Sequence, residues 1–253
     1  MSDLVKNQIL STYIPVMADE TDASEVYRWL FTQATSNVLK RRPVGYDKFV
    51  KMEELEPEDM LELLYEVESQ PDNWLVDVGR QKIAPQRDTQ AIALRGAAGV
   101  TNKVGPNLNQ DVKNMPLYDC YPRITGFMHQ FAESMDSTLS RAVIVRLSPH
   151  GQVYRHYDMG LYYALRDRYH LVLDSEGSLM QVQDEFSTWH AGELWWFHNK
   201  LYHQAHNNSD KWRVHLIFDL LPRDNFELTK MIREVSYRDK IPEEKIRDTS
   251  LIA

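Results

Sequence analysis

The feature that most constrains the fold is a series of short apolar segments in the second half of the chain, each ended by turn residues. Branched and aromatic side chains dominate residues 142–147, 169–173, 193–197 and 213–220. The turn residues between them include Pro149, Gly151, Gly177 and Gly192. Several short strands with regular turn signals are typical of a sandwich or barrel rather than a parallel α/β sheet. We therefore expect a mainly β core here.

The first half of the chain predicts helices with interruptions. Asp22 and Glu25 form a capping box before one helix, and Pro57 begins a second helix that ends before Pro71. The second helix has a predicted apolar face of Met60, Leu61, Leu64 and Val67. A third helix has a predicted apolar face of Ile124, Phe127, Met128, Phe131 and Met135. We expect both faces to pack in the core.

Shorter elements are expected around these helices. Residues 74–78 and 91–94 resemble short strands, and residues 96–106 form a loop long enough for a lid or a binding loop. A last amphipathic helix is expected near Phe226, Met231, Ile232 and Val235. No linker or low-complexity segment separates these parts, so we expect one domain over residues 1–253.

Composition excludes several classes of protein. The 253 residues carry 29 Lys and Arg against 37 Asp and Glu, a formal net charge of −8, which weighs against binding to duplex nucleic acid. Cys120 is the one cysteine, so no internal disulfide is expected and a reducing compartment is favoured. There is no secretory signal pattern and no apolar run near the roughly 20 residues of a membrane span. We expect a cytoplasmic protein without a membrane partner.

One stretch of sequence occurs twice. The segment RYHLVLD at residues 168–174 returns 45 residues later as RVHLIFD at 213–219. Alternate residues of a strand share a face, so each copy directs its Arg and His to one side. Chance similarity between β-rich segments would explain the repeat, but so would two strands that face a common barrel interior. Because a buried unpaired Arg is costly, the second explanation requires an acidic ligand.

The candidate chemistry lies among the histidines. Seven of the nine fall between His156 and His215. His156 and Asp158 share a face at a strand end, and His203 follows 47 residues later. Two histidines and one carboxylate are the ligand set of non-haem Fe(II) oxygenases. Arg213 follows ten residues after His203, where its guanidinium could hold a carboxylate beside the metal.

Residues 141–221 resemble the aspartyl/asparaginyl β-hydroxylase family of Fe(II)/2-oxoglutarate-dependent oxygenases, nearest to the proline cis-hydroxylase branch. The similar stretches are RLSPHGQVYRHYD at 146–158, the two repeated segments, GELWWF at 192–197 and LYH at 201–203. Residues 90–95 also resemble a family strand. The resemblance implies a double-stranded β-helix, that is, a cupin-like jelly roll. This core would bind metal over residues 139–222, between a helix-rich part at 1–138 with a few strands and a helical extension at 223–253.

The resemblance also implies a reaction and its residues. His156, Asp158 and His203 would be catalytic iron ligands, and Arg213, Arg168 and His170 would line the site of the 2-oxoglutarate cosubstrate. The enzyme would use O₂ to hydroxylate an unactivated C–H bond of an amino acid or a peptide or protein residue, releasing succinate and CO₂. The vertebrate protein-hydroxylating members lack the carboxylate ligand. Asp158 therefore favours the small-molecule branch.

Several alternatives stay open. His198 and His206 flank His203 but fit the family spacing less well, and His215 is a candidate for supporting the site. Arg146, Arg95, Trp195 and the loop at 96–106 are candidate substrate contacts. A non-catalytic jelly-roll module that binds a small acidic ligand or a partner protein is the alternative function. A cupin-type isomerase or dioxygenase is a third possible function. The sequence does not determine whether the protein forms a homo-oligomer.

Overall fold

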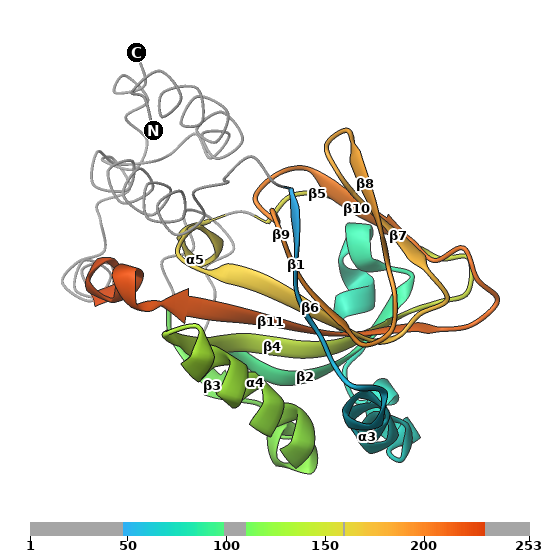
Figure 1. The fold of residues 1–253 in the computed structure, drawn as a ribbon, viewed down its shortest axis with the longest axis horizontal. Coiled ribbons are helices and arrows are strands. Elements are labelled where there is room, and N and C mark those ends of the chain that lie inside the picture. The colour runs from blue at the N-terminus through green and yellow to red at the C-terminus, as the bar shows by residue number, and fades with distance from the viewer. Residues whose placement is uncertain (1–47, 99–109, 159, 231–253) are drawn as a thin grey trace.

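The computed structural model describes residues 48–98, 110–158 and 160–230, which form two antiparallel sheets facing each other (Figure 1). The large sheet has the order β1-β9-β6-β11-β4-β2-β3. Its strands are β1 (Phe49–Glu54), β2 (Thr89–Ala97), β3 (Val112–Asn114), β4 (Ser137–Leu147), β6 (Asp167–Asp174), β9 (Glu193–Phe197) and β11 (Arg213–Pro222). The small sheet has the order β5-β10-β7-β8. Its strands are β5 (Gln152–His156), β7 (Ser178–Val182), β8 (Glu185–Trp189) and β10 (His203–His206). The predicted jelly-roll core is confirmed.

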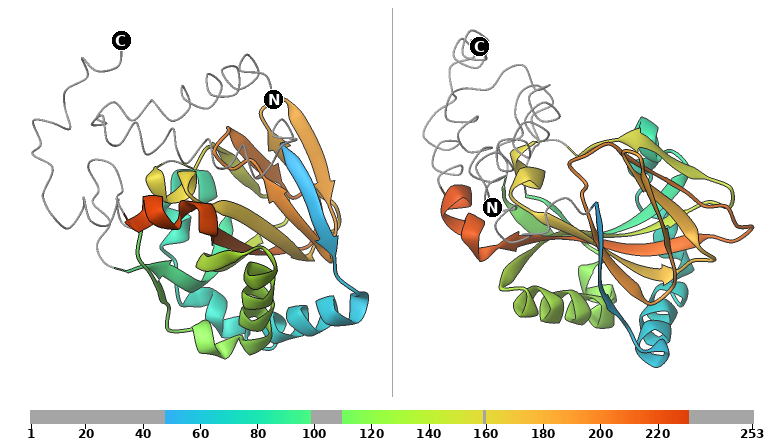
Figure 2. Two further views of the ribbon diagram at one scale, coloured as in Figure 1. Left: turned by 60° about the vertical axis from the view of Figure 1, so that its left-hand side comes forward. Right: turned by 45° about the horizontal axis from the view of Figure 1, so that its top comes forward.

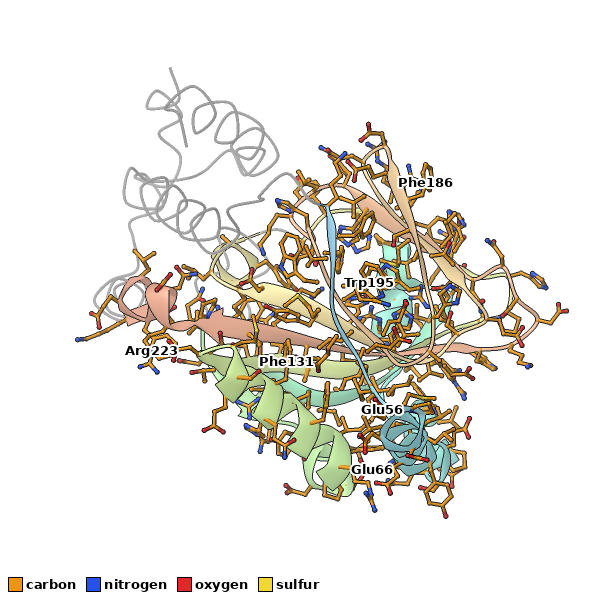
Figure 3. The ribbon with its side chains drawn as sticks, in the orientation of Figure 1. Glu56, Glu66, Phe131, Phe186, Trp195 and Arg223 are labelled. Carbon is orange, nitrogen blue, oxygen red and sulfur yellow. The ribbon has the colours of Figure 1, made fainter. Side chains whose placement is uncertain are left out.

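Helices cover the outer face of the large sheet, the face turned away from the small sheet (Figures 1 and 2). These are α3 (Pro57–Glu68) and α4 (Pro122–Ser134), and each begins with a proline that has no amide hydrogen to leave unpaired. Phe131 of α4 packs edge-on against Tyr169 of β6 and Phe218 of β11 (Figure 3). Burial of each such aromatic side chain stabilises the fold by about 1.5–3 kcal/mol. α5 (Leu161–Ala164) is a single turn before β6.

Strict alternation along β11 separates this core from the interior between the sheets. Val214, Leu216, Phe218 and Leu220 pack in the core on the outer face. The side chains that alternate with these four are therefore on the inner face. They are Arg213, His215, Ile217 and Asp219, and every residue of β11 is buried. β6 lies beside β11, and its Arg168, His170 and Val172 alternate in the same way with core residues Tyr169, Leu171 and Leu173.

The expected elements agree in part with the structure. The strands at 91–94, 142–147, 169–173, 193–197 and 213–220 and the helices after Pro57 and around Phe127 are confirmed. On α3, Leu63 is buried and Leu61 is 56% exposed, so the assignment of Leu61 to the apolar face was wrong. The strand expected at 74–78 was also wrong. A 3₁₀ helix covers Pro71–Leu75, and only Asp77 makes an isolated bridge, to Ala91.

Some expectations fall on residues outside the described ranges. They are the capping box at Asp22 and Glu25, most of the loop at 96–106, and Met231, Ile232 and Val235 of the last helix, of which residues 226–230 are helical. Part of the chain before residue 139 joins the large sheet as β1, β2 and β3. None of the helices in the described ranges is long and apolar enough to cross a membrane.

Candidate metal centre and its surroundings

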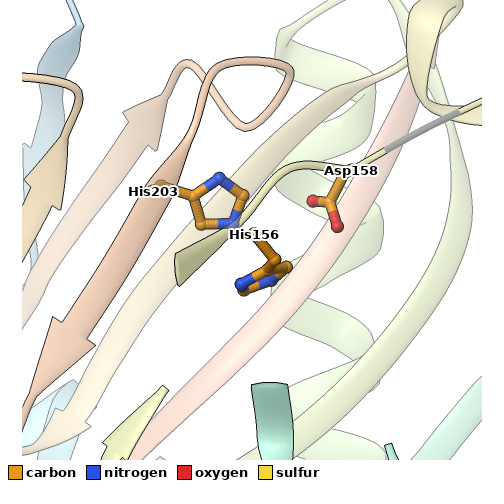
Figure 4. Close-up of side chains that lie close together, drawn as sticks. All are labelled: His156, Asp158 and His203. Atoms are coloured by element: carbon orange, nitrogen blue, oxygen red, sulfur yellow. The ribbon is translucent and has the colours of Figure 1, made fainter. Parts of the chain in front are cut away.

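Two neighbouring strands of the small sheet bring His156, Asp158 and His203 together (Figure 4). His156 ends β5 and is the direct cross-strand partner of His203, which begins β10. Their ring centroids are 4.3 Å apart. Asp158 follows β5 by two residues, and one ligand atom from each of the three side chains lies within 4.8 Å of the others. The residues that the sequence analysis predicted as ligands therefore form one cluster.

Hydrogen bonds leave one ligand atom of each histidine free. Nδ1 of His156 lies 2.7 Å from the carbonyl oxygen of Tyr154, and Nδ1 of His203 lies 2.8 Å from that of Leu201. A carbonyl oxygen only accepts, so each Nδ1 carries the proton and donates. The Nε2 atom of each ring then has its lone pair available for a metal. Burial lowers the pKa of His203 to about 4, which keeps this ring neutral at pH 7.

Asp158 is held through one carboxylate oxygen. Its Oδ2 accepts hydrogen bonds from Nη1 of Arg168 and Nδ2 of Asn199, both at 2.8 Å. The backbone N–H of Asp158 also donates to the carbonyl oxygen of Asn199. Burial alone would raise the pKa of Asp158, but the charge of Arg168 and the hydrogen bond from Asn199 contribute to a net lowering. The carboxylate is therefore ionised, and Oδ1 stays available.

This set of donors fits a divalent iron ion. It offers two imidazole nitrogens and one carboxylate oxygen. The other polar atoms of these side chains, Nδ1 of each histidine and Oδ2 of Asp158, are hydrogen-bonded within the chain. Such outer contacts orient metal ligands and set the histidine tautomer. The sequence analysis did not identify Asn199. No pattern marks it, because its role depends on both a side-chain and a backbone contact to Asp158.

Arg168 carries a charge that the chain itself neutralises. Besides Asp158, it contacts Asp219 through two hydrogen bonds, from Nε to Oδ1 at 2.8 Å and from Nη2 to Oδ2 at 3.0 Å. Burial would lower the pKa of Arg168, but the two aspartates raise it well above its usual range. The repeated sequence seemed to require an acidic ligand for its arginines. For Arg168, the acidic partners are instead two residues of the chain, Asp158 and Asp219.

Arg213 is different, because no carboxylate of the described chain pairs with it. It is 3% exposed, and its Nη1 reaches only Ser178 Oγ at 3.3 Å and Met180 Sδ at 3.7 Å. Its Nε is buried without a hydrogen-bond partner among the described residues. Burial and the nearby charge of Arg80 lower its pKa to about 9. A buried cation in this state fits an anion supplied from outside the chain.

His170 and His215, the histidines of the two repeated segments, contact each other between β6 and β11. Their Nδ1 atoms are 3.3 Å apart, and the ring of His170 also packs on Trp189 and Phe197. Burial lowers the pKa of both well below the usual value, so both are neutral. The prediction that the repeated segments face one interior agrees with this contact.

The structure places the predicted substrate contacts in different parts of the protein. Arg146 lies on the outer side of β4, between the rings of Trp74 and Trp212 at 4.6 and 4.4 Å, and its Nε donates to Gln90. It is therefore not brought to the cluster. Trp195 stacks on Trp189 with centroids 5.4 Å apart and donates to Glu193 (Figure 3 labels Trp195). Arg95 lines a cavity on the inner face that also includes Arg168.

The other histidines lie apart from the cluster. His198 is buried, and burial lowers its pKa to about 3. His206 is at the far end of β10 from His203, and His129 contacts the hydroxyl of Tyr118 at 2.7 Å. His190 is exposed. Within the described residues, only His156, Asp158 and His203 form a group that could hold a metal ion.

This chain is similar to several solved structures, each at low sequence identity. The structure of AviO1 from Streptomyces viridochromogenes has 14% identity and a TM-score of 0.43, over 70% of this chain and 90% of that one. A 2OG-Fe(II) oxygenase family oxidoreductase from Burkholderia pseudomallei has 11% identity and a TM-score of 0.47, over 74% and 89%. A prolyl-4-hydroxylase from Pseudomonas putida has 12% identity and a TM-score of 0.45, over 77% and 99%.

Sequence comparison finds one similar family. No curated protein sequence matches this chain. The family model described as Aspartyl/Asparaginyl beta-hydroxylase matches residues 108–222, which include His156, Asp158, His203 and Arg213. Residues 108–222 are therefore similar to the aspartyl/asparaginyl β-hydroxylase family, the family that the sequence analysis suspected.

Proposed function

We propose that this protein is an Fe(II)- and 2-oxoglutarate-dependent dioxygenase that hydroxylates an unactivated C–H bond of an amino acid or of a peptide or protein residue. The observation that carries the proposal is the cluster of His156, Asp158 and His203. Its free ligand atoms converge, while the remaining polar atoms of the three side chains are engaged by the chain. This is the donor set of a facial triad, which leaves metal positions open for a cosubstrate and O₂.

Each residue then has a defined part. His156 and His203 would bind iron through Nε2 and Asp158 through Oδ1, with Arg168 and Asn199 holding the carboxylate in place. Arg213 would bind the distal carboxylate of 2-oxoglutarate, with Ser178 Oγ beside it. When bound, the iron and the cosubstrate would supply the oxidation of the substrate C–H bond, with release of succinate and CO₂.

The neutral pair of His170 and His215 would line the cosubstrate site without adding charge. Both rings lie on the inner face, and His215 is the next inward residue after Arg213 on β11. A positive charge on either ring would add to the buried charge of Arg213 and the nearby charge of Arg80, so neutral rings are less costly here. Their lowered pKa values are consistent with a role in shape and hydrogen bonding.

An anaerobic absorption measurement tests the proposal. Fe(II) is added to the purified apoprotein, and then 2-oxoglutarate, while the visible spectrum is recorded. We expect a metal-to-ligand charge-transfer band that needs both additions, and succinate formation once O₂ is admitted. If the band is absent and calorimetry detects neither iron nor cosubstrate binding, the proposal is refuted and a non-catalytic binding module becomes the better interpretation. A metal that binds without any 2-oxoglutarate requirement would favour the cupin-type alternative.

A further inference from the structure

A second polar site lies next to the metal ligands, in a cavity of about 340 Å³ on the inner face of the large sheet. Its floor is made by small and branched side chains, Ala91, Ala93, Val143 and Ile217. Arg168, which holds Asp158, is part of its wall. The volume is at the small end of the range for ligand sites, which suits a compact molecule.

The wall of this cavity has an excess of positive charge. Four arginines line it against two aspartates: Arg80, Arg95, Arg141 and Arg168 against Asp77 and Asp219. Asp219 is already paired with Arg168. Arg95 donates from Nε to the carbonyl oxygen of Ser140 and from Nη1 to Asn114 Oδ1, so two of its nitrogens have partners within the chain. The cavity therefore favours an anion.

Arg141 of this wall has N–H groups that are available to bind a ligand. Its Nε and Nη2 atoms are buried and have no hydrogen-bond partner among the described residues. Its guanidinium lies 3.7 Å from the ring centre of Tyr162, which is fully buried and donates to Asp219. Stacking on a fixed ring holds the guanidinium in place, so binding a ligand there would cost little side-chain entropy.

Arg168 in the same wall shows which ligand this arrangement suits. Its Nε and Nη2 atoms form one edge of the guanidinium and bind the two oxygens of Asp219 at 2.8 and 3.0 Å. Arg141 presents the same two atoms, Nε and Nη2, without a partner in the described chain. This edge matches a carboxylate with two parallel hydrogen bonds. The expected ligand of Arg141 is therefore a carboxylate.

We propose that Arg141 binds a carboxylate of the molecule that is oxidised, so the substrate is a small free carboxylic acid, such as a free amino acid, rather than an internal residue of a peptide. This inference rests on the proposed oxygenase function. The apolar floor would hold the hydrocarbon part of the substrate, next to the Arg168–Asp158 pair. Arg213 begins β11, whereas the cavity is lined by Ile217 and Asp219 near the other end, so the two arginines would bind different carboxylates.

The test uses the full-length protein with Fe(II) and 2-oxoglutarate, in wild-type form and as Arg141→Met and Arg141→Lys. The probes are the free L-amino acids, C3–C8 alkanoic and dicarboxylic acids, the amino-acid carboxamides, and peptides blocked at both termini, including one with an internal aspartate. Two quantities are measured: the anaerobic shift of the charge-transfer band on adding each probe, and the rate of succinate formation. Arg123→Met is the matched control, because Arg123 is an exposed arginine of α4 that pairs with Glu62.

We expect at least one free acid to shift the band and accelerate succinate formation, with its carboxamide about 100-fold weaker. Two charge-assisted hydrogen bonds account for a factor of this size. Arg141→Met should bind the acid about as weakly as wild type binds the carboxamide, and Arg141→Lys should be intermediate. Both variants and the control should keep the wild-type affinity for 2-oxoglutarate. The thermal midpoint of Arg141→Met should change little, because the substitution removes two buried N–H groups without hydrogen-bond partners and keeps a side chain of similar length over Tyr162.

Each contrary result has a separate meaning. Absence of the band in wild type, together with no iron or 2-oxoglutarate binding by calorimetry, refutes the oxygenase proposal itself. A band with no response to any carboxylate, equal responses to acid and carboxamide, or an unchanged response in Arg141→Met overturns the inference about Arg141 alone. A blocked peptide that acts as well as the free acids overturns the assignment to small free molecules.

Discussion

Replacing Arg213 by methionine should weaken cosubstrate binding and stabilise the apoprotein at the same time. Methionine has a similar length but no charge. Two charge-assisted hydrogen bonds contribute about 1.5–3 kcal/mol each, and taking the lower value gives about 3 kcal/mol. The Kd for 2-oxoglutarate should therefore rise by about 100-fold. Anaerobic titration of the charge-transfer band measures this constant.

The apoprotein should respond in the opposite direction. Arg213 is 3% exposed and has only long contacts to Ser178 and Met180, and burial lowers its pKa to about 9. Replacing buried charge by apolar atoms often stabilises a protein by about 1–4 kcal/mol. For a domain of this size, 1 kcal/mol corresponds to a rise in thermal midpoint of about 2–4 °C. Calorimetry without metal or cosubstrate should detect this rise in Arg213→Met.

Two controls make the result specific to the distal carboxylate. The cosubstrate analogue 2-oxopentanoate keeps the keto acid but lacks that carboxylate. Wild type should bind it about 100-fold more weakly than 2-oxoglutarate. Arg213→Met should discriminate little between the two, which completes a double-mutant cycle. Arg223→Met serves as the protein control, because Arg223 follows β11 directly and is an exposed partner of Asp136. An Arg213→Met protein with wild-type affinity for 2-oxoglutarate would refute the reasoning.

Three further predictions concern the metal and the buried histidines. Asp158→Ala should abolish iron-dependent turnover, measured as succinate, and turnover that persists would contradict the ligand assignment. Asn199→Ala should weaken iron binding by about 10–100-fold, because one of the two side-chain contacts to Asp158 is lost; unchanged iron affinity by calorimetry would remove Asn199 from the site. His170, His198 and His215 are neutral when folded but bind protons near pH 6.5 when unfolded. Urea unfolding should therefore show a loss of about 2 kcal/mol per histidine between pH 7 and pH 5; equal stability at both pH values would contradict this.

The strands of the large sheet could be predicted because branched and aromatic residues form short segments between turn residues, and the repeated Arg and His residues indicate a common face. In β6 and β11, apolar residues on the outer face alternate with inner-face residues that include Arg, His and Asp as well as Val172 and Ile217. A period of two residues is a direct consequence of strand geometry, so the sequence carries it. The spacing of His156, Asp158 and His203 could be recognised for a similar reason, because a metal requires few residue types in a fixed order.

The segment at 74–78 shows where local pattern misleads. Its residues Leu75, Val76 and Val78 favour a strand, yet their side chains are 67%, 65% and 48% exposed. A strand forms only where a neighbouring edge can pair with it. Here β2 pairs with β4 on one side and with β3 on the other near its end, and only Asp77 bridges to Ala91. The small-sheet strands β7 and β8 were not predicted, because their sequences mix polar and apolar residues. They form strands nevertheless, since they pair with each other.

The role of Arg141 could not be predicted from the sequence. Arg95, Arg141, Arg146 and Arg168 are all arginines on strands, and sequence spacing gives no indication of which has partners. The structure distinguishes them by their contacts. Arg168 is paired with two aspartates and Arg146 is stacked between tryptophans, whereas Arg141 keeps buried N–H groups without partners in the described chain.

The stability of the fold and the chemistry of the site depend on the same register of β11. A shift of this strand by one residue would turn all its inner side chains outward. Arg213 and Asp219 would then enter the apolar core, and the link from Asp219 through Arg168 to Asp158 would be lost. The residues that oppose such a shift are Val214, Leu216, Phe218 and Leu220, which pack against the helices. The outer core therefore does more than stabilise the barrel. It also determines that Arg213 and Asp219, about 20 Å apart along one strand, face the same interior.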